Sequence, residues 1–334
     1  MGPTAGERVE GFFKDTVMQI QPSMAAAAMR ATQGISDAEI LDILANPVII
    51  LSAPRSGSTL LFEQLSRFDC FWTIGGESHG IFQTFPSLRT ENADFDSMAL
   101  SAGHASPEIC AVFRRCFVLL MRNHQGVPFL SLPKQQRPTK IYMLEKTPRN
   151  ALNIPFIRKV FPKARFIFQH RDPRQTVSSL MEAWTIGLQT GRFVTFRDLP
   201  DWTLPAWCFL LPRGWRELKN KPLAEIAAFQ WRASNQAIID GLAEVPRSCW
   251  TSIDYSALVE DPAKALGGIK TALELASEIP DFTSQNLPFS RTTVSPPHPD
   301  KWKRHKAEID ALWPMLSETE AQIISFCQPP ELTQ

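Results

Sequence analysis

Short apolar runs alternate with amphipathic stretches along most of this chain. The runs are rich in β-branched and aromatic residues, which favours strands buried on both faces of a parallel sheet. The predicted strands lie at 48–51, 70–74, 141–148, 164–171 and 249–255. The first predicted helix begins at Ser58, and later helices span 107–126, 156–161, 173–180, 223–242 and 263–276. This repeated order predicts an α/β fold, with a doubly wound parallel sheet flanked by helices.

Two segments depart from that pattern. We predict that residues 1–46 form accessory N-terminal helices, because a capping box at 36–39 precedes several apolar residues. Without a readable function, their expected role is packing or dimer formation. Residues 185–222 are rich in Trp and Pro and lack a clear period. We interpret them as a lid over an acceptor site, with an ordinary surface excursion as the alternative. Residues 47–334 otherwise form a single predicted domain, which ends in a Pro-rich loop at 284–304 and a terminal helix.

The composition narrows the class of protein. The chain has 334 residues, of which 44% are hydrophobic and 21% charged, so it is long enough to bury a large core. A net charge of +1 gives no reason to expect nucleic-acid binding. Six scattered cysteines without a CxxC pair favour free thiols in a reducing compartment. Without an apolar signal or spanning segment, we expect a cytoplasmic protein that does not enter a membrane.

The segment from Pro47 to Leu61 has the features of an anion site. A strand, a turn of small residues and a helix start bring free backbone N–H groups to the positive end of a helix dipole. Arg55 adds a fixed charge to the turn. The segment is not a nucleoside-triphosphate loop of the Walker A type, because Ser52 and Ser58 replace its first Gly and its Lys. The structural alternative is a polar turn with an N-cap.

A second anion site is predicted where the strand at 164–171 ends. Arg171 stands at the strand end, and Ser179 follows eight residues later, about two helical turns beyond an Asp-Pro turn. A guanidinium can grip a phosphate through two parallel hydrogen bonds. The structural alternative for Arg171 is an ion pair with Asp172 or with another carboxylate.

Together, Pro54-Arg-Ser-Gly-Ser-Thr-Leu60 and Phe166-Ile-Phe-Gln-His-Arg-Asp-Pro-Arg174 with Ser179 resemble the PAPS-dependent sulfotransferase family. PAPS is 3′-phosphoadenosine-5′-phosphosulfate, and the resemblance extends over roughly residues 47–305. It implies a P-loop-type fold in which Arg171 and Ser179 bind the 3′-phosphate of the donor. It also implies a 5′-phosphosulfate loop made of Arg55, Ser56, Gly57, Ser58, Thr59 and Leu60. The cofactor would be PAPS, with PAP as its product. We expect no divalent metal, because no carboxylate follows a second apolar strand in the Walker B manner and no His/Cys cluster has ligand spacing.

Sulfuryl transfer needs a base for the acceptor hydroxyl. Glu77 follows Gly75-Gly76 after a predicted strand and resembles the catalytic Glu of tyrosylprotein sulfotransferases and many bacterial relatives. It would need a dry site that raises its pKa toward neutrality. The competing base is His79, since cytosolic small-molecule sulfotransferases use a His. The structural alternative for Glu77 is an ordinary loop carboxylate.

Transfer also needs cations at the leaving group, and Arg55 and Lys146 are the candidates. Lys146 resembles a transition-state lysine of the tyrosylprotein enzymes; a salt bridge to Glu145 is its structural alternative. The late loop lacks the Arg-Lys-Gly signature of the cytosolic enzymes, and its Lys301-Trp302 resembles the bacterial and tyrosylprotein branch. Further cofactor contacts implied by the resemblance are Tyr255, Ser295 and Lys301.

These observations predict a sulfotransferase that moves a sulfuryl group from PAPS to a hydroxyl of an acceptor. The acceptor would be a small apolar or aromatic molecule, or an acyl group bound to a carrier protein. A P-loop kinase or NTPase, and a non-catalytic nucleotide-binding protein on the same fold, are the alternatives. We expect no nucleic-acid or membrane partner, and a homodimer stays open.

Overall fold

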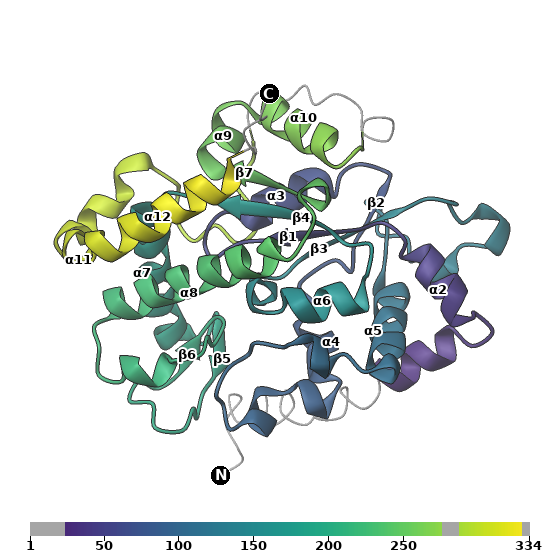
Figure 1. Cartoon of the computed structure of the whole chain (residues 1–334), viewed down its shortest axis with the longest axis horizontal. Helices are drawn as coiled ribbons and strands as arrows, with labels where there is room; N and C mark the ends of the chain where they lie inside the picture. The colour runs from purple at the N-terminus through teal and green to yellow at the C-terminus, as the bar shows by residue number, and fades with distance from the viewer. Residues whose placement is uncertain (1–23, 276–286, 329–334) are drawn as a thin grey trace, which may run out of the picture.

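The computed structural model describes residues 24–275 and 287–328, and its centre is a parallel sheet of five strands. The strands follow the order β2-β3-β1-β4-β7 across the sheet, and every neighbouring pair is parallel. Their bounds are β1 (Pro47–Leu51), β2 (Phe71–Trp72), β3 (Tyr142–Lys146), β4 (Arg165–His170) and β7 (Trp250–Asp254). The predicted α/β class is confirmed, and Figure 1 shows helices packed around these strands.

The central strand β1 explains why the sheet is covered on both faces. All five of its residues are buried. Because successive side chains in a strand point to opposite faces, Val48 and Ile50 join one hydrophobic core while Ile49 and Leu51 join the other. A strand of this kind is stable only between two helical layers.

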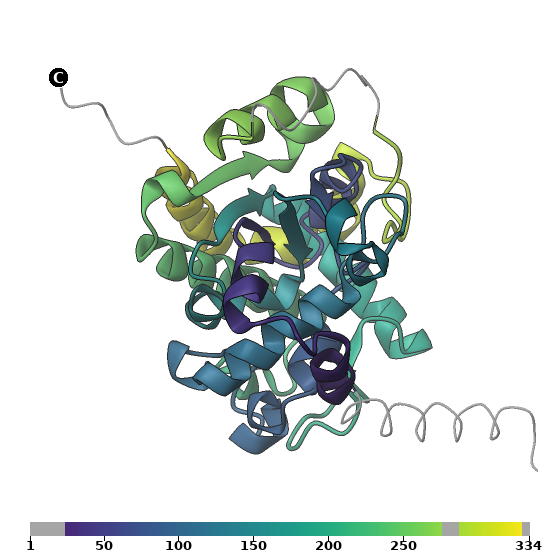
Figure 2. The same ribbon diagram turned by 90° about the vertical axis from the view of Figure 1, so that its right-hand side faces the viewer.

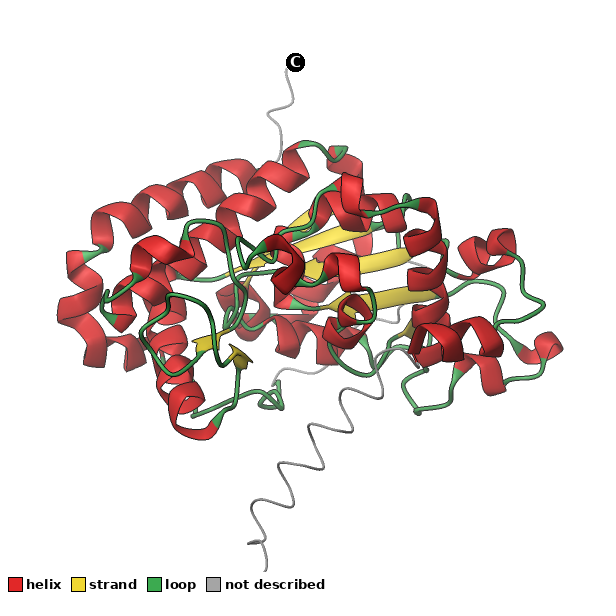
Figure 3. Cartoon of the chain, turned by 90° about the horizontal axis from the view of Figure 1, so that it is seen from below, coloured by secondary structure: helices red, strands yellow, loops and turns green. Residues whose placement is uncertain are grey.

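The two helical layers lie on opposite sides of the sheet, as Figure 3 shows. The smaller core, around Val48 and Ile50, contains residues of α3 (Ser58–Leu65), α9 (Tyr255–Glu260) and α10 (Pro262–Ala272). The larger core contains residues of α4 (His79–Gln83), α5 (Pro107–Leu120), α6 (Ile154–Val160), α7 (Pro173–Thr190) and α8 (Leu223–Ala243). The C-terminal helices α11 (Lys306–Ala311) and α12 (Trp313–Cys327) contact α7 and α8.

Some predicted bounds were wrong. The helix expected over 107–126 ends at Leu120, because Arg122 forms antiparallel bridges with Thr73 and Pro128. The helix expected over 263–276 ends at Ala272, and residue 276 lies outside the described residues. The single terminal helix is two helices, α11 and α12. No helix within 24–275 and 287–328 combines the length and apolar character needed to cross a bilayer.

The N-terminal helices pack on the edge of the domain, beside α5 (Figure 2). Residues 24–31 are helical, α2 spans Asp37–Ile43, and the capping box at 36–39 is confirmed. The guanidinium of the buried Arg115 in α5 donates to the Thr32 carbonyl at 3.2 Å and to the Asp37 carboxylate at 2.6 Å. Residues 1–23 of the predicted accessory segment lie outside the described residues.

The predicted lid needs two corrections. Residues 185–190 continue helix α7, so the excursion begins at Gly191, where the helix ends in a left-handed cap. Within it, β5 (Val194–Phe196) and β6 (Trp207–Cys208) form a small antiparallel sheet. Trp207 and Trp215 are buried beside Trp184 in a core of their own and do not face a pocket. The Trp-rich composition therefore reflects the packing of the excursion itself.

Candidate active site

The carboxyl ends of the parallel strands open into a pocket with a volume of about 620 Å³. Residues just beyond β1, β4 and β7 line it, together with residues from the excursion after α7 and from the late loop (residues 287–304). This is the edge of an open α/β sheet where ligands bind. Among the predicted site residues, Ser56 and Lys146 do not line the pocket, whereas the other candidates do.

Gly57 fixes the shape of the turn after β1. It has a φ of +91°, which glycine adopts without steric cost, and it caps the N-terminus of α3. A Cβ atom at this position would lie 2.3 Å from Cδ2 of Tyr255. The turn and the Tyr255 ring are therefore in contact, and the N-terminus of α3 opens beside them with Ser58 and Thr59 in the pocket wall.

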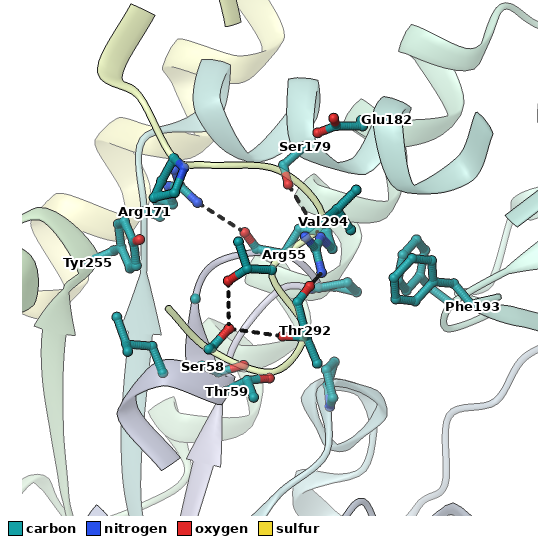
Figure 4. Close-up of a pocket in the computed structure, with 18 of the residues that line it drawn as sticks. Arg55, Ser58, Thr59, Arg171, Ser179, Glu182, Phe193, Tyr255, Thr292 and Val294 are labelled. Carbon is teal, nitrogen blue, oxygen red and sulfur yellow. Dashed lines mark hydrogen bonds between the residues drawn. The ribbon is translucent and has the colours of Figure 1, made fainter. Parts of the chain in front are cut away.

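Arg55 reaches from this turn across the pocket (Figure 4). Its Nε donates to the Ser179 hydroxyl at 3.3 Å, and its Nη1 donates to the Thr292 carbonyl at 3.1 Å. Ser179 was predicted to act with Arg171, but in this structure it accepts from Arg55. The spacing on α7 placed Ser179 at the right end of the sheet and left its partner undetermined.

Arg171 lies on the other side of the turn. Its guanidinium stacks over the Tyr255 ring, 4.2 Å from the ring centre, and two of its nitrogens donate to the Gln175 amide oxygen. Its Nη1 also donates to the Arg55 carbonyl at 3.4 Å. The two predicted anion sites are thus joined directly. The alternative of an Arg171–Asp172 ion pair is wrong, because the Asp172 side chain caps α7 by accepting from the Gln175 N–H.

Neither of these arginines has a carboxylate partner among the described residues; each donates only to neutral oxygens. Burial lowers the pKa of Arg55 to about 10, and the nearby charges of Arg192 and Arg171 act in the same direction, against Glu182. Burial also lowers the pKa of Arg171. Glu182 acts on Arg55, and Asp172 and Asp254 act on Arg171, only without direct contact among the described residues. An anion bound at the two arginines would therefore offset the cost of their partial burial.

Glu77, Lys146 and His79 form a connected chain of contacts. Lys146 Nζ lies 2.5 Å from one oxygen of Glu77, and His79 Nε2 lies 2.9 Å from the other. The Lys146 side chain is 2% exposed and does not line the pocket, whereas its partner Glu77 does. The structure therefore brings together both candidate bases and one candidate cation for the leaving group.

This arrangement contradicts the expected pKa of Glu77. Burial alone would raise the pKa, but the His79 hydrogen bond and the Lys146 charge outweigh it and lower the pKa to about 2. The sequence could not show that both carboxylate oxygens have a partner. The alternative salt bridge of Lys146 to Glu145 is also wrong, since the Glu145 carboxylate accepts from Ser78, Thr147 and Asn150.

The late loop is held to α7 by Glu182, a residue that the sequence analysis did not single out. One Glu182 oxygen accepts from Ser295 at 2.8 Å, and the other lies 2.9 Å from Lys301 and 3.0 Å from Arg304. The predicted cofactor contacts Ser295 and Lys301 line the pocket, but here they bind this carboxylate. Glu182 lies three residues after Ser179, hence on the same helix face, and that spacing was a usable signal.

The excursion after α7 supplies an apolar wall to the pocket. Phe193 and Phe209 stack with their ring centres 5.2 Å apart, and Val194 and Leu210 line the pocket beside them. Met98 extends this wall from another loop. Within the described residues, no cluster of His, Cys, Asp or Glu is arranged to hold a metal ion.

His170 is structural. It does not line the pocket and forms an ion pair with Asp254, with its Nδ1 3.4 Å from the carboxylate. Burial disfavours the charged imidazole, but the partners Asp254 and Cys327 outweigh it and raise the pKa from 6.5 to about 9. A raised pKa in the folded state contributes stability that is complete below about pH 6.5 and is lost as the pH rises through about 9.

We therefore expect His170→Gln to lower the free energy of unfolding by about 2 kcal/mol near pH 6 and by much less near pH 10. Urea unfolding of both proteins across this range measures the difference. A loss that stays constant with pH would contradict the ion pair.

Comparisons with known proteins bear on the family of this chain. Residues 47–279 match the model of a family described as the sulfotransferase family. No curated protein matches the chain. Among solved structures, the chain is similar to the sulfotransferase domain from the Synechococcus PCC 7002 olefin synthase, with 20% identity, 83% of this chain and 94% of that chain covered, and a TM-score of 0.41.

Two further bacterial structures are similar to the chain. The sulfotransferase from Alicyclobacillus acidocaldarius has 13% identity and a TM-score of 0.47, with 84% of this chain and 95% of that chain covered. The sulfotransferase STF1 from Mycobacterium tuberculosis H37Rv has 14% identity and a TM-score of 0.45, with 89% of this chain and 80% of that chain covered.

Proposed function

This chain belongs to the sulfotransferase family, and on that premise we propose that it transfers a sulfuryl group from PAPS to a hydroxyl of an acceptor. The observation that supports this most strongly is the pair of half-buried arginines, Arg55 and Arg171, which line one pocket without a carboxylate in direct contact among the described residues. PAPS carries an anionic group at each end of its ribose, which matches two separate cationic sites.

The residues of the pocket fit such a donor. Arg55 and the N-terminus of α3 would hold the 5′ end, because free N–H groups and a guanidinium meet there. Arg171 would hold the 3′-phosphate. Glycine at position 57 lets the turn lie directly against the Tyr255 ring, because a Cβ there would come within 2.3 Å of it. When bound, PAPS supplies an activated sulfuryl group, with PAP as the leaving group.

Glu77 would accept the proton of the acceptor hydroxyl. Its pKa of about 2 makes it ionised at neutral pH, but the contact with Lys146 makes it a weak base in this arrangement. We infer that Lys146 moves from Glu77 toward negative charge at the donor. Glu77 then loses a stabilising charge, and its basicity increases. Lys146 in turn would offset charge that develops on the leaving group.

The acceptor would occupy the half of the pocket between Glu77 and the apolar wall of Phe193, Phe209 and Met98. Such a wall favours a small acceptor with an apolar or aromatic body, or an acyl chain on a carrier. The alternative base, His79, also lines the pocket and contacts Glu77.

The proposed activity is tested by incubating the protein with PAPS and a library of hydroxyl compounds and searching for sulfated products by mass. ATP with Mg²⁺ serves as the parallel donor. Sulfated products that depend on PAPS support the proposal. Turnover of ATP without sulfation would instead favour a kinase or NTPase, and PAP binding without any product would favour a non-catalytic protein.

A further inference from the structure

Arg149 is a charged residue of the pocket that the proposed reaction does not use. It lies in the short 3-10 helix Pro148–Leu152 that follows β3, three residues after Lys146. It lines the pocket, yet the residue is only 4% exposed. Its position in the chain places it near the carboxyl end of the sheet, where the candidate catalytic groups also lie.

The contacts of Arg149 leave most of its hydrogen-bonding capacity unused. Its Nη2 donates to the Leu88 carbonyl at a long 3.4 Å, and its guanidinium lies 4.9 Å from the centre of the Phe82 ring. Its Nε is buried and has no partner. Among the described residues it makes no ion pair, and Glu91 acts on it only at longer range. Burial lowers its pKa to about 10, so it stays charged at neutral pH.

A buried guanidinium with one weak hydrogen bond destabilises a fold unless something else uses it. The other two unpaired arginines of the pocket, Arg55 and Arg171, suffice for the two anionic ends of the proposed donor. Arg149 lines the pocket together with Glu77, Gln83 and Met98. In this structure Glu77 pairs with His79 and Lys146 and makes no ion pair with Arg149.

We propose that Arg149 binds a carboxylate on the acceptor, so that the acceptor is a hydroxy acid with an apolar body. This inference rests on the proposed function. The planar guanidinium matches a carboxylate through two parallel N–H···O bonds. The apolar wall of Phe193, Phe209 and Met98 contacts the body of the molecule, and Glu77 receives the hydroxyl proton. A neutral ester of the same acid would leave the Arg149 charge without a partner.

The test measures binding to PAP-saturated protein by calorimetry. The probes are para-hydroxyphenylacetate and ω-hydroxydecanoate, each compared with its methyl ester. We expect at least one acid to bind about tenfold or more tightly than its ester. Arg149→Met should weaken that acid by about 10- to 100-fold, the range for a hydrogen bond to a charged group, and should leave the ester within about twofold.

Arg137→Met is a matched control. Arg137 also donates to backbone carbonyls, of Leu130 and Leu132, and lies over the Phe129 ring, but it does not line the pocket. It should leave the preference for the acid intact. Thermal unfolding separates the two roles further: Arg149→Met should keep or raise the melting temperature, because it removes an unpaired buried charge.

Three results would overturn the assignment. The first is that, for both probes, the acid binds no more tightly than its ester. The second is that the preference of the wild-type protein for the acid over the ester persists in Arg149→Met, and the third is a large loss of melting temperature in that variant. A loss of PAP affinity in Arg149→Met would place the residue in the donor half and also overturn it. If the wild-type protein fails to bind PAP, the proposed function itself fails; if PAP binds and no preference appears, only the assignment of Arg149 fails.

Discussion

Glu77→Gln is expected to lower kcat for sulfuryl transfer by about a thousandfold, within the range of 100- to 10,000-fold typical for a positioned base. The amide keeps the size of the side chain but cannot accept the proton. PAP affinity should change by no more than about threefold, because Glu77 lies outside the two arginine sites. Steady-state rates measure the effect on kcat, with a hydroxyl compound from the library that the wild-type protein sulfates as the acceptor. Calorimetry with PAP measures the effect on affinity separately.

The control is Glu63→Gln. Glu63 is a half-buried carboxylate on α3 that pairs with Arg291 but does not line the pocket. The kcat of the Glu63→Gln variant should stay within about threefold of the wild-type value. His79→Ala distinguishes the two candidate bases. A loss of about a thousandfold in His79→Ala, with a much smaller loss in Glu77→Gln, would assign the base to His79 and leave Glu77 as its partner.

Gly57→Ala is expected to abolish donor binding and to destabilise the protein. The alanine would need a φ of +91° and would bring its Cβ to 2.3 Å from the Tyr255 ring. The left-handed conformation costs about 1–2 kcal/mol, and overpacking adds about 1–3 kcal/mol. If Tyr255 moves to relieve the clash, it withdraws from Arg171, so we expect PAP affinity to fall by at least about a hundredfold.

Gly34→Ala provides the matched comparison, since Gly34 has a φ of +85° and no atom within 4 Å of the added Cβ. It should show the conformational cost alone and no change in PAP affinity. The double variant Gly57→Ala, Tyr255→Ala should recover the part of the stability lost to overpacking. A Gly57→Ala protein that binds PAP like the wild type would contradict the close contact between the turn and the ring.

The parts of the site that the sequence predicted are those encoded within a few neighbouring residues. The turn after β1, its Gly57 and the helix that follows form a continuous segment, and the carboxyl ends of parallel strands must lie at one edge of the sheet. For that reason Arg55 and Arg171 could be placed in the same pocket. The N-cap at Asp172 and the start of α7 also follow from local chemistry.

The parts that the sequence could not predict depend on contacts between distant segments. The pKa of Glu77 is lowered by its neighbour His79 and also by Lys146, 69 residues away, and the late loop is bound by Glu182, 119 residues before Lys301. The Trp-rich composition of the excursion predicted a cover over an acceptor site, but these Trp side chains pack against one another in a separate core. Nothing in the sequence singles out Arg149, and what distinguishes it is burial with an Nε that has no hydrogen-bond partner among the described residues.

The central claim is that Arg55 and Arg171 form two anion sites for one adenosine that carries two phosphates. Calorimetry with PAP and with adenosine 5′-phosphate, which lacks the 3′-phosphate, tests it most directly. We predict that the wild-type protein binds PAP at least about a hundredfold more tightly than adenosine 5′-phosphate. Arg171→Met should remove this preference and leave adenosine 5′-phosphate binding unchanged. Equal affinity of the wild-type protein for the two nucleotides, or no binding of PAP, would contradict the account.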